Sequence, residues 1–250
     1  MTQPLEHSHD PQAIRRRLAS GNRPSYLPDA ILGGIDGCIT TLAVVASVAG
    51  AGLPGVVAFV LGVASLIADA FSMGVSNYQA VKSTEDARRR LREQEKRHVA
   101  VDPRGEREEI RAIFEAKGFH GDALENIVET ITSDRRLWVD TMLMEEHGLA
   151  LTGPSAGKAG LATFTTFVLV GFIPLLPFLV PVFTGGEYFV ASALITALAL
   201  FGIGYVKGVI LAMNRWRAGM ETLLMGSGAA LVAFLVGTVL EPMLADLRFL

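Results

Sequence analysis

Two acidic side chains lie inside stretches that are otherwise apolar enough to cross a membrane. Asp36 falls within AILGGIDGCITTLAVVASVAGAG, and Asp69 falls within the next apolar stretch, four residues before Met73. A charged group at the bilayer centre costs at least about 2.5 kcal/mol, so such acids are rare and mark ion pathways. Carboxylate with thioether suits a first-row divalent metal better than magnesium or calcium, which prefer oxygen ligands alone. Carboxylates can also exchange protons, as a coupled carrier requires.

Helix geometry places these three side chains at a similar depth. The turn between the two stretches is short, around Leu53–Pro54, so the stretches form an antiparallel hairpin. At about 1.5 Å per residue, Asp36 and Met73 both lie on the order of 10 Å inside one membrane boundary, and Asp69 lies one turn deeper. We therefore expect these three side chains to form an ion-binding site between the two helices. The structural alternatives are that Asp36 hydrogen-bonds a neighbouring helix and that Met73 only packs.

Further candidate ligands occur as pairs at helical spacing in a charged segment. The pairs are Glu95 with His98, Glu106 with Glu109, and Met142 with Glu146. A spacing of three or four residues lets one helix direct two side chains at one ion. The same spacing is typical of a solvated helix face, so the pattern alone leaves both interpretations open.

The elements that must position these residues include five apolar segments. Half of the 250 residues are hydrophobic, and charge is concentrated between Lys82 and Lys158. A membrane span takes roughly 20 apolar residues. The segments that qualify are Ala30–Gly52, Pro54–Val81, Ala159–Val182, Tyr188–Met213 and Met220–Leu240.

Polar and proline residues in the later spans are less specific signals. The third span is interrupted by three prolines, Pro174, Pro177 and Pro181. This pattern fits a simple helix kink and a stretch of exposed backbone that lines a pathway equally well. Lys207 and Glu221 lie near the ends of the fourth and fifth spans. We expect them to reach the membrane surface or to pair with each other.

The segment between the second and third spans is expected to form a small helical domain. Residues 83–99 contain strong helix formers, so the second span should continue as one long helix that Pro103 ends. Three further helices fit Glu106–Lys117, Ala123–Thr132 and Arg135–Glu146. Their apolar residues follow helical spacing and can form a core, which metal binding or dimerisation would support.

Basic residues predict the orientation of the spans. Arg15, Arg16, Arg17 and Arg23 precede the first span, and most other Lys and Arg lie between the second and third spans. The N-terminus and the inserted domain are therefore expected to be cytoplasmic, with the C-terminus on the opposite side. The predicted fold is an all-α membrane protein with five transmembrane helices. Its parts are an N-terminal tail (1–28), helices 1 and 2 (29–82), a cytoplasmic helical metal-binding domain (83–157) and helices 3 to 5 (158–250).

Several functional classes find no support in the sequence. The net charge is only −3, which gives no nucleic-acid signal, and the single Cys38 cannot form an internal disulfide. The polar N-terminal stretch lacks a short apolar core with a cleavage site, so we expect the first span to remain as an anchor. Walker, GxSxG and HExxH motifs are missing from the sequence, so we expect neither an enzyme, nor an ATP-driven pump, nor a prosthetic group.

Six motifs occur in order along the chain and cover about residues 29–237. They are GGIDGCITTLAVVASVAGAG, SMGVSNY, LWVDTMLMEEHGL, GFIPLLPF, ALFGIGYVKG and WRAGMETLLMG. This combination resembles the vacuolar iron transporter family, with the yeast cross-complementers of calcium sensitivity, plant vacuolar iron transporters and nodulin-like relatives. The resemblance implies a homodimer of five-span subunits with a cytoplasmic helical metal-binding domain. It also implies that ferrous iron, and often manganese, leaves the cytosol in exchange for protons.

The resemblance also assigns candidate ligands in this chain. The family's membrane acid and methionine correspond to Asp36 and Met73. In the inserted segment its ligands correspond to Glu95, Glu106, Glu109, Met142 and Glu146. Leu143 stands in the place of a second methionine. His98 stands in a glutamate place and can still bind metal as neutral imidazole. Ser76 and Asn77 replace a common glycine–glutamate pair, and Asp69 is the candidate substitute for that missing carboxylate.

The preferred hypothesis is a divalent-metal/proton antiporter that exports ferrous iron and manganese, with zinc and cobalt as further candidate ions. Its partners are membrane lipid, the ions, protons and a second copy of the chain. One alternative is a non-transporting membrane sensor or metal store, and another is a carrier for a small organic cation. The compact length and the absence of organellar sorting signals favour a bacterial plasma membrane.

Overall fold

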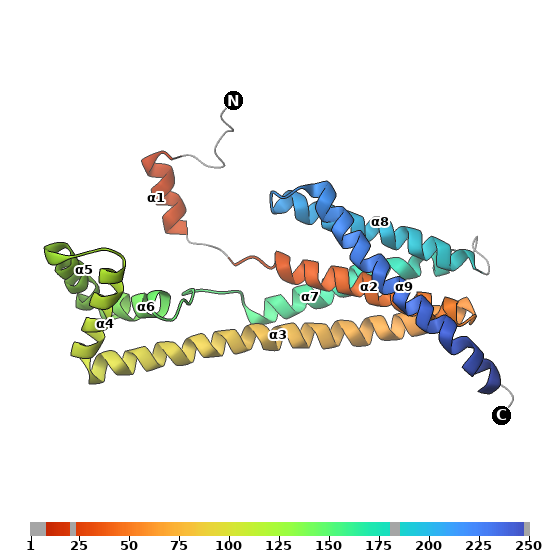
Figure 1. Ribbon diagram of the computed structural model, residues 1–250, viewed down its shortest axis with the longest axis horizontal. Helices are drawn as coiled ribbons and strands as arrows, with labels where there is room; N and C mark the ends of the chain where they lie inside the picture. Colours follow the sequence, from red (N-terminus) through yellow and green to blue (C-terminus); the bar gives the residue numbers. More distant parts are fainter. Residues whose placement is uncertain (1–8, 21–23, 181–185, 248–250) are drawn as a thin grey trace.

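The computed structural model describes residues 9–20, 24–180 and 186–247, and these residues form helices joined by short connections (Figure 1). Five helices within these ranges are long and apolar enough to cross a membrane: α2, α3, α7 with its continuation η1, α8 and α9. The predicted all-α, multi-span fold is confirmed. The elements are α1 (Pro11–Ser20), α2 (Leu27–Gly50), α3 (Gly55–Val101), α4 (Pro103–Ala116), α5 (Gly121–Ser133), α6 (Arg135–Glu145), α7 (Ala156–Gly171), η1 (Ile173–Leu179), α8 (Glu187–Ile210) and α9 (Arg215–Leu247).

The longest element is α3, a continuous helix of 47 residues. At about 1.5 Å per residue it is roughly 70 Å long, more than twice the thickness of a bilayer's hydrocarbon core. The predicted continuation of the second span is therefore confirmed. The helix ends at Val101, and Pro103 begins α4 after a sharp corner (Figure 1).

The third span changes from α-helix to 3-10 helix. Pro174 and Pro177 lie in η1. Since proline offers no N–H to the preceding turn and crowds its carbonyl, regular α-helix ends before these residues and tighter turns follow. Pro181 and the predicted end of the span at Val182 lie outside the described residues.

Helix α2 is the central helix of the membrane half and contacts α3, α7, α8 and α9. Glycines allow the closest of these approaches. A Cβ atom on Gly33 or Gly37 would collide with backbone carbonyls of Thr163 or Phe167 on α7. Such small residues one turn apart are typical of helix pairs that pack backbone to backbone in membranes.

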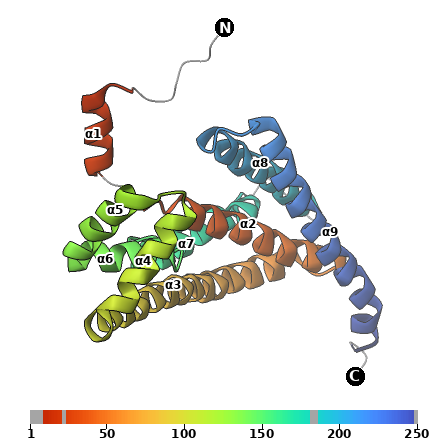
Figure 2. The same cartoon turned by 60° about the vertical axis from the view of Figure 1, so that its left-hand side comes forward.

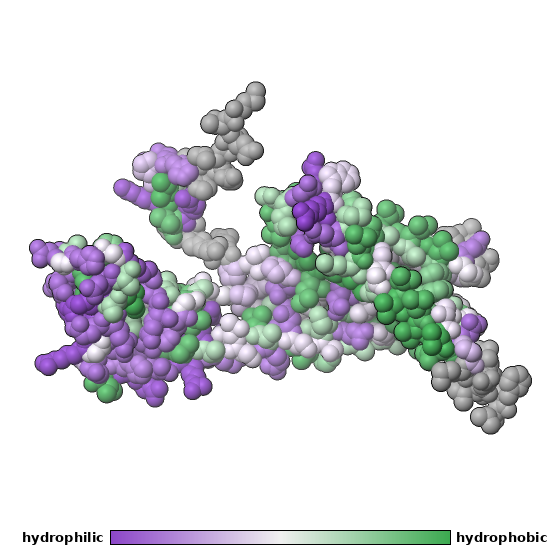
Figure 3. Space-filling view, viewed as in Figure 1, coloured by the Kyte–Doolittle hydropathy of each residue, from purple (hydrophilic) through white to green (hydrophobic). Residues whose placement is uncertain are grey.

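The two ends of the molecule differ in polarity. Hydrophilic surface covers α4, α5, α6 and the adjoining end of α3, whereas hydrophobic surface covers the helices at the other end (Figure 3). We refer to residues 91–149, which contain α4–α6 and the end of α3, as the polar unit. Figure 2 shows the same unit gathered at the end of α3, away from α8 and α9. The polar unit has its own buried core, which includes Ile110, Val128, Trp138 and Leu143.

Helix α1 is an addition to the elements expected from the sequence. Asp10 accepts hydrogen bonds from the backbone N–H groups of Gln12 and Ala13 (3.0 and 3.3 Å). Pro11 occupies the first helical position, where its missing N–H is not needed. This capping begins a short helix within the stretch that the sequence analysis treats as a tail.

Candidate functional site

The corner between α3 and α4 brings two predicted ligand pairs together. Asp102 caps α4 by accepting a hydrogen bond from the Gly105 N–H (3.0 Å). This short connection places the last turn of α3, with His98, against the first turn of α4, with Glu106. Nδ1 of His98 lies 3.3 Å from Oε1 of Glu106 and 3.9 Å from Oε1 of Glu95. Glu95, His98 and Glu106 thus offer three ligand atoms within 4.8 Å of one another.

Helix α6 adds a second group of ligands around the same Glu95 carboxylate. An ion pair between Arg92 and Asp140 (2.6 Å) fixes α6 against α3. At the end of α6, Nε2 of His147 lies 3.1 Å from Oε1 of Glu95 and 3.6 Å from Oε2 of Glu146. Glu95, Glu146 and His147 therefore form a second group that could hold an ion.

Burial distinguishes this cluster from an ordinary charged helix face. Glu95 is 1% exposed and Glu106 is 5% exposed. One oxygen of each, Oε2, is buried without a hydrogen-bond partner among the residues that the structure describes. A buried anion without a partner is costly, so these oxygens have the chemistry expected of ligands that await a cation. The solvated-face alternative does not account for them.

Electrostatics in the cluster disfavour the ionised carboxyl groups. Burial, together with the negative charges of Glu109 and Glu95, raises the pKa of Glu106 to about 7. Burial also raises the pKa of Glu146, and the charges of Glu95 and Glu109 add to that rise. A divalent cation would reverse this balance, because it stabilises the ionised form of each ligand.

Two predicted ligands of the polar unit lie at its edge or in its core. Glu109 is near enough to act electrostatically on both Glu106 and Glu146, one turn after Glu106 on α4. Met142 is fully buried and belongs to the hydrophobic core of the unit, one turn before Glu146 on α6. Packing is therefore part of the role of Met142, and its part as a ligand stays a prediction.

In the membrane half, Asp36 and Met73 line one open pocket of about 740 Å³. The pocket lies between α2, α3 and the end of α8, and apart from these two residues and Lys207 its walls are aliphatic. The carboxylate of Asp69 lies within electrostatic range of Asp36, but it accepts a hydrogen bond from Ser65 (2.6 Å) and does not line this pocket. The hairpin thus brings the three side chains into one region, with Asp69 held to one side.

Lys207 is a residue whose position sequence reasoning did not anticipate. It lines the pocket that contains Asp36 and Met73. Glu221, its expected partner, instead pairs with Arg217 one turn earlier on α9 (3.0 Å). The sequence shows Lys207 only as a charge near a span end, and its neighbours depend on how α8 packs on α2.

A polar network at the start of α2 was also missed. The side-chain amide of Asn77 donates to Asp29 and to Thr163, both at 2.7 Å. These bonds join α2, α3 and α7. Asn77 is one of the residues that depart from the family pattern, and its observed contacts are structural.

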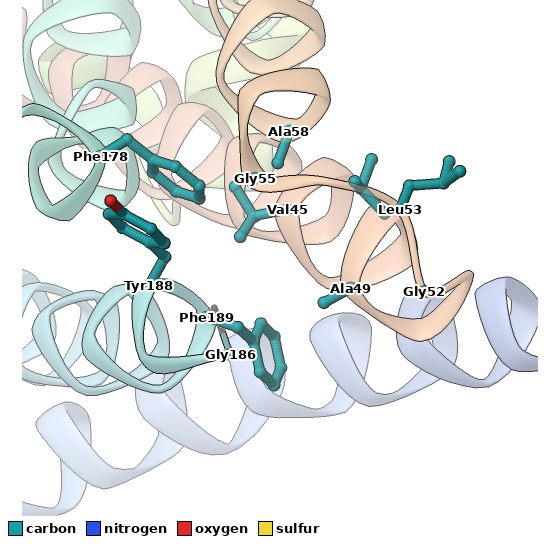
Figure 4. A pocket seen from close by; sticks show the side chains of 11 residues that line it. Val45, Ala49, Gly52, Leu53, Gly55, Ala58, Phe178, Gly186, Tyr188 and Phe189 are labelled. Atoms are coloured by element: carbon teal, nitrogen blue, oxygen red, sulfur yellow. The ribbon is translucent and has the colours of Figure 1, made fainter. Parts of the chain in front are cut away.

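The opposite end of the α2–α3 hairpin holds a different kind of pocket. It has a volume of about 250 Å³ and is lined by apolar and aromatic side chains (Figure 4). The rings of Phe178 and Tyr188 stack there with centroids 5.2 Å apart. Among the described residues that line it, none carries a charged side chain, so their side chains offer neither carboxylate nor imidazole to a cation.

The sequence is similar to known proteins over most of its length. Residues 27–238 match the model of the VIT family. The chain is 32% identical to vacuolar iron transporter 1 of Arabidopsis thaliana over 215 residues, which is 85% of each chain. It is 31% identical to vacuolar iron transporter 2 of Oryza sativa over 212 residues, covering 82% of this chain and 84% of the relative. It is 30% identical to a vacuolar iron transporter of Toxoplasma gondii over 225 residues, covering 86% and 74%.

Proposed function

The chain belongs to the VIT family, and from that premise we propose that it carries ferrous iron across a membrane and out of the cytosol. Members of this family are transporters and not enzymes. The observation that carries the proposal is that one helix, α3, bears candidate ligands in both parts of the molecule. Glu95 and His98 lie in the polar unit, and Met73 lies in the membrane half, where it lines the same pocket as Asp36.

The proposed orientation places the polar unit in the cytosol. The arginines of α1 and the many basic residues between α3 and α7 support this choice, because positive charge is retained on the cytoplasmic side. Residues 1–28 and 83–157 are then cytoplasmic, residues 29–82 and 158–250 form the membrane part, and the C-terminus lies on the far side.

In the proposed path, the polar unit captures the ion and the membrane pocket passes it on. Glu95 and Met73 are 22 residues apart on α3, or roughly 33 Å along the helix. The two sites are therefore too far apart to share one ion. The polar unit concentrates the ion at the membrane surface, and Asp36 with Met73 accepts it in a separate step, with Asp69 close by.

Proton exchange is the driving force that we propose for export. Asp36 is a carboxylate inside a span, and it can bind either a metal ion or a proton but not both at the same oxygen. Return of a proton through the same group would release the ion on the far side. Manganese is proposed as a second substrate, because carboxylate-rich sites also suit Mn²⁺, and zinc and cobalt are further candidates.

We also propose that the transporter is a homodimer in a bacterial plasma membrane. The Asp36 pocket is open along one side of the single chain, and a second copy packed against that side would enclose the ion. Cross-linking in native membranes tests the dimer, and membrane fractionation of the source cells tests the location.

The decisive experiment is flux through purified protein in liposomes. Ferrous iron should enter vesicles only when protein is present, while a lumenal pH dye reports protons moving the opposite way. A sensor or store would bind iron without flux. A carrier for organic cations would transport its substrate without competition from iron, manganese or zinc.

A further inference from the structure

His147 is a polar-unit residue to which neither the motifs nor the family resemblance assigns a role. The end of α6 fixes its backbone. The His147 N–H donates to the Met142 carbonyl (3.3 Å), and Gly148 turns the chain with φ of +63°. Its side chain is only 19% exposed, which is low for a histidine that follows the end of a surface helix. The imidazole is therefore held in the cluster and not in solvent.

The contacts of this imidazole converge on carboxylate oxygens. Nε2 lies 3.1 Å from Glu95 and 3.6 Å from Glu146. A hydrogen bond between His147 Nε2 and Glu95 Oε1 satisfies that oxygen of Glu95, but Oε2 stays buried without a partner in the described part of the chain. A purely structural histidine would thus leave a buried carboxyl oxygen unsatisfied, at a cost that a bound cation removes.

The distances also fit a metal ion. The three candidate atoms of Glu95, Glu146 and His147 lie within 4.8 Å of one another. Ligands at about 2.0–2.2 Å from one ion are separated by at most about 4.4 Å, so a small inward movement of the half-exposed Glu146 would close the site. His98 makes the same kind of group with Glu95 and Glu106.

We propose that His147 is a metal ligand of the polar unit, and that with His98 it makes the unit favour ions that accept imidazole nitrogen over manganese. Carboxylate and water ligands suit Mn²⁺, whereas imidazole suits iron, cobalt and zinc. This inference rests on the proposed function for the identity of the transported ion. The preference of the polar unit among metal ions is nevertheless measured by binding, separately from transport.

The test compares metal binding by the full-length protein in detergent and by its His147→Gln variant. Glutamine keeps a hydrogen-bond donor for Glu95 but is a poor ligand for these metals. Calorimetric titration with Co²⁺, Zn²⁺ and Mn²⁺ should show Co²⁺ and Zn²⁺ affinity falling about tenfold to a hundredfold in the variant. The affinity for Mn²⁺ should fall much less. His120→Gln is the matched control, because His120 is exposed and lies outside both ligand groups.

A second measurement detects ligation by each imidazole directly and does not use the affinity of a variant. Hyperfine-shifted proton NMR of the Co²⁺-loaded wild type should show an exchangeable imidazole N–H signal from each of His98 and His147. Replacing either histidine with glutamine should remove its own signal and leave the other. Absence of the His147 signal from the loaded wild type would overturn the proposal.

The remaining outcomes separate this inference from the proposed function. Unchanged Co²⁺ and Zn²⁺ affinity in His147→Gln, or an equal loss for all three ions, would show that His147 only supports the fold. If iron flux into liposomes occurs in that case, the proposed function stands and the inference fails. If the binding preference is found but no flux occurs, the inference stands and the proposed function fails.

Discussion

At the scale of single residues, the polar unit buries carboxyl groups at the place where we propose that a cation binds. Glu95 and Glu106 are buried, and each has an oxygen that no described group satisfies. Because burial and neighbouring carboxylates raise the pKa of Glu106 to about 7 from 4.5, its ionised form is less favourable in the folded protein than in the unfolded chain. The metal-free unit should therefore lose stability as the pH rises between these two values.

Replacing Glu106 with glutamine should stabilise the metal-free protein and weaken metal binding. At pH 8 the glutamine side chain cannot ionise, so the variant avoids the cost of a buried charge. Its unfolding temperature should exceed that of the wild type by about 4–8 °C for each kcal/mol gained in the free energy of unfolding. Near pH 4 the difference should vanish, since Glu106 is then protonated in both states. Fluorescence of Trp138 in a Trp216→Phe background reports the melting of this unit. Equal melting temperatures at pH 8 would contradict the prediction.

Asp36 should matter for transport and not for capture. Asp36→Asn keeps the size of the side chain but removes the charge that an ion or proton requires. Iron flux into liposomes should fall at least about tenfold, the loss that even an indirect partner of a metal ligand causes. Iron binding by the polar unit should persist in the same preparation. Asp86→Asn, which alters an exposed ion pair with Lys82, is the control and should transport normally.

At the scale of elements, the position of Asp36 depends on how closely α2 packs on α7. Gly33 and Gly37 flank Asp36 and face carbonyls of α7. A side chain on either glycine would force the two helices apart and displace the wall of the pocket that contains Asp36 and Met73.

Gly37→Val should therefore destabilise the membrane half by about 1–3 kcal/mol, the usual cost of overpacking. Denaturation in mixed detergent micelles, followed by circular dichroism, measures the change. Gly228→Ala is the matched control on α9, because no described atom lies within 4 Å of the added Cβ. A stability of Gly37→Val equal to that of the control would show that α2 and α7 can separate freely.

The sequence predicted most elements because apolar spacing and helix formers report local structure. The continuation of α3 to Val101 follows from residues 83–99, which contain no breaker. Contacts between distant residues were harder to predict. The hydrogen bond between Asn77 and Asp29 joins residues that are 48 positions apart. His147 and its partner Glu95 are 52 positions apart, so no helical spacing of three or four residues links them in the sequence. Such residues meet only through tertiary packing, which periodicity does not encode.

At the scale of the whole molecule, α3 joins the polar unit to the membrane half, and so connects the proposed capture site with the proposed transport pocket. Arg89 lies between the two ends of this helix, with 69% of its side chain exposed. Proline there should break the helix between Met73 and Glu95 at a cost of about 3 kcal/mol or more, while leaving the candidate ligands themselves unchanged.

Arg89→Pro should retain iron binding in detergent but transport poorly when iron is scarce. Saturating iron should restore part of the flux, because the Asp36 pocket can then fill directly from solution. Arg89→Ala controls for the lost charge and should behave as the wild type. If the proline variant transports normally at low iron, the continuity of α3 is unnecessary.

An unbroken rod of this length acts as a lever. Residues 55–81 pack against α2 and α7, while Glu95 and His98 project well beyond them. Any tilt of the membrane half must therefore move Glu95 and His98 through a far larger arc than Met73. The same rigidity acts in the opposite direction. Binding or release of an ion beside Glu95 and His98 would, through the rigid helix, shift the pocket that contains Asp36 and Met73.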